Sequence, residues 1–319
     1  MLDPLNDFLR HTQAPKWSIE GVIAEGELNM LFGEPGAGKS FTALDFALCI
    51  ATGTPWMGHE VSQGPVVYLP SEGFEGFRAR IRAWCSHRNI AADNIPLFMG
   101  AYEMALNDPA DYAEVENDLG AIRPDPRLIV IDTLTGMTKG LDQNFAKEMA
   151  AFADTCKALK DLTGAAILVV HHSGHKDKGR SKGAVDFWAA CDRVIGVKRS
   201  GQCGALALTC AKSRNGPPFE DIHVKLEQCE PAAVLVEADK PVNTEGSTLN
   251  RGDRIFREVI GDEPIDTAEA KSAFYEKYGK SPGANRNAWS RAFEKAVNAG
   301  YVETAANGLI SPNTHTPHK

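Results

Sequence analysis

Short apolar runs alternate with helical repeats along most of this 319-residue chain. Four of the runs have the length and composition of buried strands, at residues 28–32, 66–69, 128–132 and 166–171. Between the last two, apolar residues recur at helical spacing until Gly164: Met149, Phe152, Ala153, Cys156 and Leu159. Strands that alternate with helices in this way predict an α/β core with a mostly parallel sheet over residues 28–237.

The pattern changes after residue 172. Four further runs are expected to be strands, at residues 193–197, 205–210, 222–226 and 233–236, and strict alternation in the third indicates a solvated sheet face. Residues 238–249 contain Pro241, Asn243 and Gly246 and are typical of a linker. Residues 1–27 are expected to form an N-terminal arm that packs on this subunit or on a neighbour.

A second, smaller unit is predicted at residues 250–310. Its apolar residues fall into three helical groups: Ile255, Phe256 and Val259, then Ala270, Phe274 and Tyr278, then Trp289, Phe293 and Val297. A small hairpin is expected around Asn307-Gly308, a dipeptide that favours a tight turn. Three helices and a hairpin predict a winged helix-turn-helix, followed by a disordered tail at residues 311–319.

Composition and charge limit the location and the partners. The net charge of −8 means that the molecule as a whole does not attract polyanions, so any contact with nucleic acid must come from a local basic patch. No apolar run is long enough to span a membrane, and the N-terminus lacks the pattern of a secretory signal. The seven cysteines form no C-x-x-C pair. We therefore expect a cytoplasmic protein with reduced thiols and no membrane partner.

One stretch matches the pattern G-x-x-x-x-G-K-[ST]: Gly33, Glu34, Pro35, Gly36, Ala37, Gly38, Lys39 and Ser40. It follows a predicted strand and precedes a helical segment that begins with Phe41. The predicted nucleotide-binding residues are these eight together with Phe41. Here glycines let backbone N–H groups face phosphate oxygens, and the helix dipole favours an anion. Lys39 is expected to reach the β- and γ-phosphates of ATP, and Ser40 to bind Mg²⁺. An ordinary glycine-rich turn is the alternative.

Two carboxylates are candidates for the chemistry of hydrolysis. Asp132 ends an apolar run, where it can hold Mg²⁺ beside the phosphate loop; the alternative is an Asp at a turn after a buried strand. Thr133 follows it, so no acid adjoins this position. Glu72 follows the run at residues 66–69 and is the candidate general base, whereas its alternative role is to stabilise the start of a helix.

The fourth run ends in His171-His172-Ser173, where a polar side chain can contact the γ-phosphate and respond to its loss. We expect His171 rather than His172 to act as this sensor. Metal binding by His171, His172 and His175 is the competing interpretation, but adjacent residues of a strand point to opposite faces.

A basic stretch with several glycines follows at residues 174–183 and has four cations against one Asp: Lys176, Lys178, Arg180 and Lys182. A basic loop next to a γ-phosphate sensor fits a grip on single-stranded DNA that changes with hydrolysis. A solvated charged loop is the alternative.

Residues 211–217 lie at the end of a predicted strand and contain two cations, Lys212 and Arg214. An arginine supplied by a neighbouring subunit can neutralise charge on a transferred phosphoryl group. From the residues alone, this role is no better supported than the alternative, an exposed turn whose charges have no function.

Together these residues resemble the RecA-like ATPases, most closely the ring-forming replicative helicases, and among them plasmid helicases of the RepA type and related phage ATPases. The resemblance covers about residues 15–230. Its distinctive parts are Glu72, His171-His172-Ser173 and Lys212-Ser213-Arg214-Asn215-Gly216, which is similar to the K-x-R-N-G element of DnaB-type helicases. The resemblance implies a hexameric ring in which Arg214, together with Lys212, enters the next subunit's ATP site. It also implies that the loop at residues 173–183 lines a channel for single-stranded DNA.

In the C-terminal unit, cations lie on or just before the third predicted helix: Lys280, Arg286, Arg291 and Lys295. Arg286 and Arg291 are candidates for contact with duplex DNA. Docking of a replication protein is the alternative, because winged helices also serve as protein-binding modules.

The sequence thus predicts an ATP- and Mg²⁺-dependent DNA helicase or translocase of phage or plasmid replication type that works as a hexamer. The main alternative is an ATP-switched DNA-binding regulator or loader that assembles on DNA without unwinding it. A recombinase filament is disfavoured because no N-terminal polymerisation motif is evident.

Overall fold

The computed structural model describes residues 4–5, 15–100, 104–138, 140, 146–172, 182–199, 205–239, 251–261, 263–279, 281–298, 301–304 and 308–312. The chain divides into two compact units, Met1–Pro241 and Val242–Lys319. Among the helices in these ranges, none combines the length and the hydrophobicity that crossing a membrane requires.

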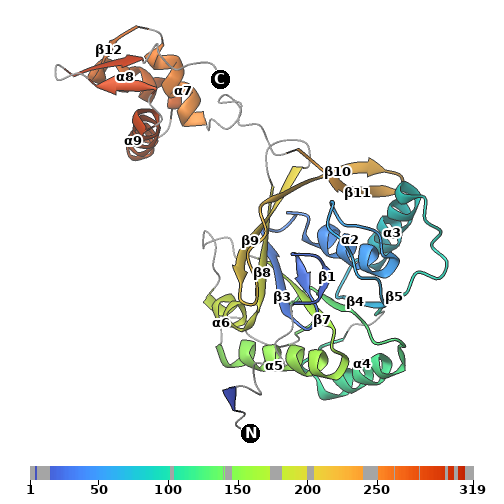
Figure 1. Cartoon of the computed structure of the whole chain (residues 1–319). Helices are drawn as coiled ribbons and strands as arrows, with labels where there is room; N and C mark the ends of the chain where they lie inside the picture. The colour runs from blue at the N-terminus through green and yellow to red at the C-terminus, as the bar shows by residue number, and fades with distance from the viewer. Residues whose placement is uncertain are drawn as a thin grey trace. The chain divides into compact units, whose positions relative to one another are not determined.

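Within the described residues, the larger unit is built on one nine-stranded sheet in the order β11-β10-β9-β8-β3-β7-β6-β4-β5 (Figure 1). The parallel strands are β3 (Leu28–Gly33), β4 (Val66–Pro70), β5 (Leu97–Met99), β6 (Leu128–Asp132), β7 (Ala166–His172) and β8 (Arg193–Arg199). Antiparallel strands extend the sheet beyond β8: β9 (Ala205–Ser213), β10 (Ile222–Cys229) and β11 (Ala232–Glu237). The predicted α/β fold with a mostly parallel sheet is confirmed, and every predicted strand of this core lies within an observed one.

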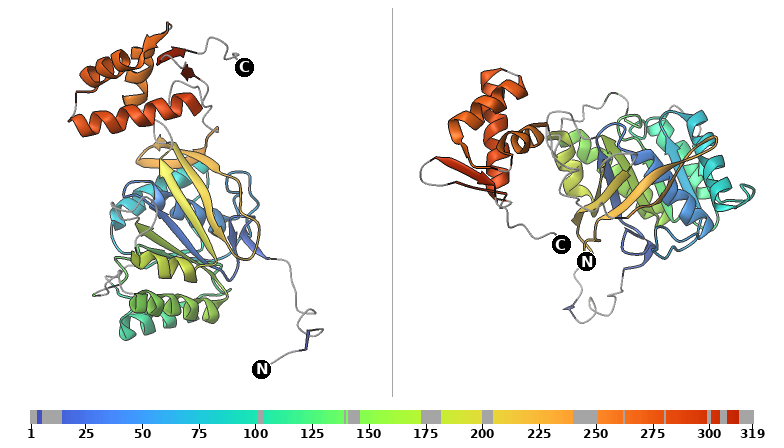
Figure 2. Two further views of the ribbon diagram at one scale, coloured as in Figure 1. Left: turned by 90° about the vertical axis from the view of Figure 1, so that its left-hand side faces the viewer. Right: turned by 90° about the horizontal axis from the view of Figure 1, so that it is seen from above.

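Helices cover both faces of the sheet (Figures 1 and 2): α2 (Lys39–Thr52) and α3 (Phe74–Arg88) on one, and α4 (Pro109–Ala121), α5 (Ala146–Thr163) and α6 (Lys182–Ala190) on the other. Leu31 and Tyr68 share a core with α2 and α3, whereas Met30 and Val67 belong to the core on the α4–α5 side. Successive strand residues point to opposite faces, so a sheet covered on both sides needs continuous apolar runs.

A short hairpin precedes the sheet, made of β1 (Trp17–Ile19) and β2 (Ile23–Ala24). Ile19, Val22 and Ile23 are fully buried in the core that contains α2. This part of the expected N-terminal arm therefore packs on its own subunit. Residues 1–3 and 6–14 lie outside the described residues.

The smaller unit contains α7 (Arg251–Ile260), β12 (Ile265–Asp266), α8 (Thr267–Tyr278), α9 (Pro282–Asn298), β13 (Val302–Thr304) and β14 (Leu309–Pro312). The strands form a sheet in the order β12-β14-β13. Phe256, Phe274 and Trp289 lie in its core, and the ring centroid of Trp289 is 5.0 Å from that of Phe256 and 5.5 Å from that of Phe274. β14 continues through Pro312, so the tail does not begin at residue 311 as expected. Residues 313–319 and the predicted linker from residue 240 onward lie outside the described residues.

Candidate nucleotide site

The candidate phosphate loop joins β3 to α2. Gly38 precedes α2 with a φ of 91°, in the left-handed region, and makes no side-chain cap. A Cβ at Gly33 would lie 2.3 Å from the carbonyl oxygen of Val197, and one at Gly38 would lie 2.7 Å from Leu206 Cδ1. The backbone of β8 therefore leaves no room for a side chain at Gly33, whereas at Gly38 it is the positive φ that favours glycine. The first amides of α2 are left without a capping side chain, as a site for an anion needs.

Lys39 is buried in the loop, with 3% of its surface exposed. Its Nζ donates to the carbonyl oxygens of Gly33 and Glu34, both at 3.0 Å, and lies 2.9 Å from Nδ1 of His172. Burial lowers the pKa of Lys39 to about 8, while the charge of Asp132 acts in the opposite direction. An ammonium group held by neutral oxygens in a buried loop can exchange them for the anionic oxygens of a phosphate.

Asp132 is buried at the end of β6 and is held from two sides. Ser40 Oγ donates to its Oδ1 at 3.2 Å, and Tyr68 OH donates to its Oδ2 at 2.6 Å. Burial raises the pKa of Asp132, and the hydrogen bonds from Tyr68 and Ser40 oppose this. Neighbouring ligands of an octahedral Mg²⁺ ion lie about 3 Å apart. The Ser40 and Asp132 oxygens are thus spaced as two ligands of Mg²⁺ would be.

The end of β4 adds a second carboxylate. Pro70 pairs with Asp132 across the sheet, Ser71 N donates to the Asp132 carbonyl oxygen at 2.6 Å, and Thr133 N donates to Ser71 Oγ at 3.1 Å. The next residue, Glu72, is exposed and near enough to act electrostatically on His172. The structure therefore brings Glu72 to the edge of the sheet where the phosphate loop ends.

The two histidines lie on different faces of β7. His172 faces the loop lysine, and burial together with the Lys39 charge lowers its pKa, whereas Asp132 and Glu72 raise it. His171 is 5% exposed, pairs with Phe32 across the sheet, and has no hydrogen-bond partner on either ring nitrogen among the described residues. Burial, followed by the charges of His172 and Lys39, lowers the pKa of His171 to about 4.

The sequence favoured His171 as the sensor, but the structure brings His172 to the loop instead. Strand periodicity says that adjacent histidines face opposite sides, and it does not say which side carries the phosphate loop. That information comes from the packing of α2 on the face shared by Leu31 and Val170.

Arg199, at the end of β8, contacts the tip of the loop and was not predicted. Its Nε and Nη2 donate to the carbonyl oxygen of Gly36 at 3.1 and 2.9 Å. Tyr68 and Ser71 were also missed. These contacts join segments far apart in sequence, and no local pattern marks them.

Lys212 and Arg214 lie at the other end of the strands. Ser213 pairs with Arg193 at the start of β8, while the phosphate loop follows the far end of the parallel neighbour β3. Lys212 Nζ donates to three carbonyl oxygens around the end of α6, at 2.6 to 2.9 Å. Arg214 donates to Asp192 Oδ1 at 3.1 Å and to the Ala189 carbonyl oxygen at 2.9 Å. Neither cation takes part in the phosphate site of its own chain.

The predicted DNA-binding loop is largely outside the described residues. Lys176, Lys178 and Arg180 fall in the range 173–181, and Lys182 begins α6 without a described side chain. In the smaller unit, Arg286 and Arg291 are exposed on α9. Lys295 Nζ donates to Asp253 Oδ2 at 2.6 Å, so it is used within the unit, and Lys280 is not described.

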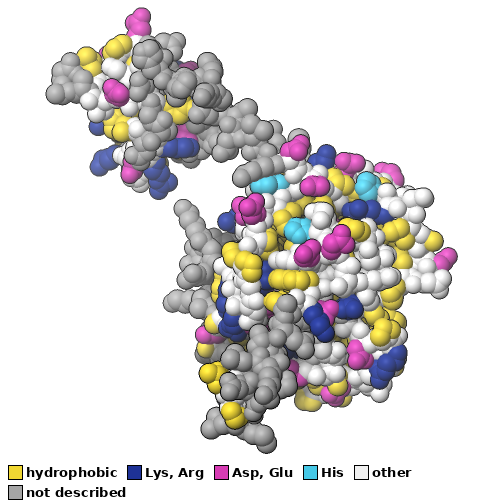
Figure 3. Space-filling view, viewed as in Figure 1, with side chains coloured by type: hydrophobic (Ala, Val, Ile, Leu, Met, Phe, Trp, Pro, Cys, Tyr) yellow, Lys and Arg dark blue, Asp and Glu magenta, His cyan; other side chains and the backbone are white. Residues whose placement is uncertain are grey.

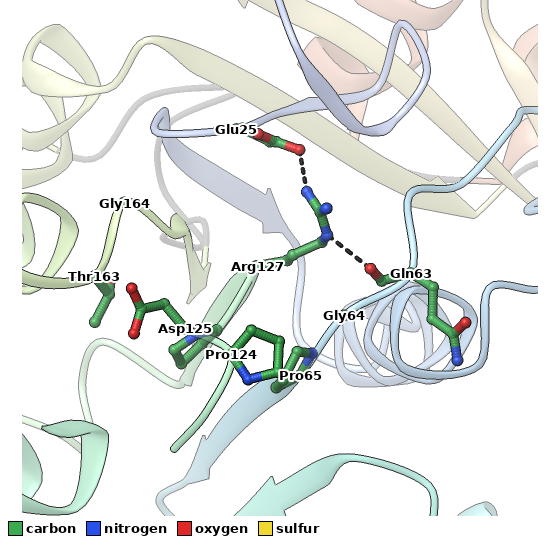
Figure 4. A pocket seen from close by; sticks show the side chains of 10 residues that line it. Glu25, Gln63, Gly64, Pro65, Pro124, Asp125, Arg127, Thr163 and Gly164 are labelled. Carbon is green, nitrogen blue, oxygen red and sulfur yellow. Dashed lines mark hydrogen bonds and ion pairs between the residues drawn. The ribbon is translucent and has the colours of Figure 1, made fainter. Parts of the chain in front are cut away.

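A pocket of about 340 Å³ opens at the opposite edge of the sheet from the phosphate loop (Figure 4). Arg127 crosses it and bonds to Glu25 and to the carbonyl oxygen of Gln63. This cation is already paired within the pocket. Figure 3 shows acidic and basic side chains interspersed on the visible face of the larger unit, without one dominant sign.

A family model described as an AAA domain matches residues 2–178. Among solved structures, one ATPase domain is similar, with a TM-score of 0.50, 12% sequence identity, and coverage of 67% of this chain and 86% of that one. The crystal structure of the RadB recombinase matches with a TM-score of 0.46 at 13% identity, over 67% of this chain and 93% of that one. No curated protein matches the sequence significantly.

Proposed function

The chain belongs to the AAA domain family, and from this premise we propose that it is an ATP-dependent DNA helicase or translocase of phage or plasmid replication type. The coarse part of this statement, a P-loop ATPase domain with a RecA-like fold, agrees with the family and with the likeness to the solved ATPase domain. The substrate, the movement on DNA and the hexameric assembly are the proposal.

The observation that carries the proposal is the meeting of Lys39, Ser40, Asp132 and Glu72 at one edge of the sheet. In the proposed reaction, Lys39 leaves the carbonyl oxygens of Gly33 and Glu34 and binds the β- and γ-phosphates of ATP. The exposed carboxylate of Glu72 accepts a proton from the attacking water. Such a division of roles needs one buried cation and one accessible base, which is the observed arrangement.

Ser40 and Asp132 are the residues that would hold Mg²⁺. When bound, the ion neutralises negative charge on the phosphate oxygens. Tyr68 fixes the Asp132 carboxylate through its short hydrogen bond, so the orientation of this group does not depend on the nucleotide.

His172 replaces His171 as the proposed sensor. It contacts Lys39 and is the last residue of β7, directly before the basic loop at residues 173–183. A change at the γ-phosphate would therefore be passed from Lys39 to His172 by their hydrogen bond, and from His172 to the basic loop that follows it in the chain. We propose that the loop grips single-stranded DNA and that its hold changes with hydrolysis.

The hexamer and the role of Arg214 in the neighbouring site rest on the resemblance to ring-forming helicases. The position of Arg214, at the opposite strand end from its own phosphate loop, supports a contact with a second copy rather than with its own nucleotide. Mixed subunits test this: Arg214→Ala and Glu72→Gln proteins should each lack ATP turnover and should recover part of it when combined.

The element order α7-β12-α8-α9-β13-β14 supports the prediction of a winged helix-turn-helix in the smaller unit, and the exposed Arg286 and Arg291 on α9 support a contact with duplex DNA. The same feature favours the second candidate function, an ATP-switched regulator or loader that assembles on DNA without unwinding it. Docking of a replication protein on this unit is the alternative to a contact with DNA.

Strand displacement on a forked DNA substrate separates the two functions. A helicase should release the strand only with ATP and Mg²⁺, its ATPase should be stimulated by single-stranded DNA, and its mass in solution should rise to that of a ring. The Lys39→Ala variant should lose ATP turnover and displacement while keeping its fold. A protein that binds DNA with ATP but displaces no strand supports the regulator, and a monomer that ignores oligonucleotides contradicts both.

A further inference from the structure

Arg80 lies on α3 near the candidate nucleotide site, and its guanidinium has no hydrogen-bond or ion-pair partner among the described residues. It is partly buried, and two aromatic rings hold it in place. The guanidinium carbon lies 4.2 Å from the ring centre of Phe41 and 5.3 Å from that of Phe77. An unpaired cation fixed in this way is ready to bind an anion.

The two rings place Arg80 beside the Ser40–Asp132 pair. Phe41 follows Ser40 directly, and the Phe77 ring lies 5.1 Å from that of Tyr68, whose hydroxyl bonds to Asp132. Burial raises the pKa of both Asp132 and Tyr68, and the charge of Arg80 opposes it in each case. Arg80 is thus close enough to act on the carboxylate that would hold Mg²⁺.

The charges closest to the Mg²⁺ position also favour a second cation there. Asp132 and Glu72 bring two negative charges, and Lys39 brings one positive charge. ATP with bound Mg²⁺ is itself an anion at neutral pH, so a further cation beside these three residues favours its binding. Arg80 supplies such a charge from the same subunit.

We propose that Arg80 binds the γ-phosphate of ATP as a cation supplied by the same subunit, an assignment that rests on the proposed ATPase function. The α- and β-phosphates would be enclosed by the amides of the loop and of the first turn of α2. Arg80 lies on α3, the helix that follows Glu72, the candidate base, and its ring contact with Phe41 places it beside the start of α2.

The test compares two nucleotides that differ by this one phosphate. Calorimetry should measure the affinity of Arg80→Gln for adenylyl imidodiphosphate, a non-hydrolysable ATP analogue, and for ADP. Loss of a charge-assisted contact should weaken analogue binding by about 10- to 100-fold and leave ADP binding nearly unchanged. ADP binding also reports that the variant is folded.

Two further variants serve as controls. Arg82 is exposed on the same helix, so Arg82→Gln should bind both nucleotides like the unmodified protein. Arg80→Lys keeps the charge and loses the planar fork, so its analogue affinity should lie between those of the unmodified protein and Arg80→Gln.

Equal weakening for both nucleotides, no change in either, or no recovery in Arg80→Lys would overturn the assignment of Arg80 to the γ-phosphate. An unmodified protein that binds neither nucleotide would instead contradict the proposed ATPase function itself.

Discussion

Asp45 is a buried carboxyl group that should make the stability of the larger unit depend on pH. It lies on α2, is 2% exposed, and accepts hydrogen bonds from Trp56 Nε1 at 2.8 Å and Trp84 Nε1 at 2.7 Å, one on each oxygen. Burial raises the pKa of Asp45 from 3.8 to about 6, although both indoles and the charge of Arg88 act against this. The folded protein therefore holds this proton more tightly than the unfolded chain does.

The sign of the effect follows from this difference. The stabilising contribution of the protonated carboxyl is complete below pH 3.8 and is lost as the pH rises through about 6. The difference between the pKa of Asp45 in the folded protein and in the unfolded chain corresponds to about 3 kcal/mol in the free energy of unfolding. The buried His171, whose pKa is lowered, contributes with the opposite sign in the same range. The effect of Asp45 must therefore be measured as a difference between two proteins.

The variant is Asp45→Asn, which has similar shape and no titration in this range. The asparagine side chain has one carbonyl oxygen, which accepts hydrogen bonds from the two indoles less well than the two oxygens of a carboxyl group do. We therefore expect the variant to be less stable than the unmodified protein at acid pH by about 1–3 kcal/mol. The stability advantage of the unmodified protein should then shrink by about 2–3 kcal/mol between about pH 4 and about pH 7.5.

Urea unfolding followed by thiol labelling makes the measurement specific to one unit. All seven cysteines precede residue 242, so a pyridyl disulfide, which reacts at acid pH, reports on the larger unit alone. Asp161→Asn, at an exposed position of α5, is the matched control and should follow the unmodified protein. An advantage that stays constant across the whole pH range would refute the reasoning.

Two other substitutions probe the site. Tyr68→Phe leaves an oxygen of buried Asp132 without its donor, so urea unfolding should show that the larger unit loses about 1–3 kcal/mol of stability. ATP turnover should also fall, and unchanged turnover would contradict the positioning role of Tyr68. His172→Asn should reduce the turnover of ATP by about tenfold because it loses the contact with Lys39, whereas His171→Asn should reduce it much less. Steady-state kinetics decide between the histidines, and the reverse ranking would restore the original prediction of His171.

The strands could be predicted because each buried strand of the parallel part is a continuous apolar run between polar stretches. The run 128–132 coincides with β6, and 66–69 is one residue shorter than β4. β5 and β1 were missed because three residues carry too little periodicity to be recognised. The pairing of Ser40 with Asp132 could also be anticipated, since parallel strand ends meet at one edge of a sheet.

Other contacts of the site depend on facts that sequence order does not contain. The bond from Tyr68 to Asp132 needs the register in which Tyr68 pairs with Val130, so that its ring reaches past the strand end. The position of Arg80 between two rings needs the packing of α3 on α2. Such contacts arise from tertiary packing, and a pattern within one segment cannot reveal them.

Strand β9 connects the two regions that the proposed mechanism requires to act together. Leu206, near its start, packs on the phosphate loop at Gly38, and Lys212, near its end, binds the carbonyl oxygens around the end of α6. The strand is hydrogen-bonded to β8 along its length, so its two ends are joined through a continuous ladder. The phosphate loop and these cations lie at opposite strand ends of one subunit, which is the arrangement that the head-to-tail contacts of the proposed ring require. In the proposed ring, a shift of the loop on nucleotide binding would reach Arg214, and through it the next nucleotide, without any contact between the two sites inside one chain.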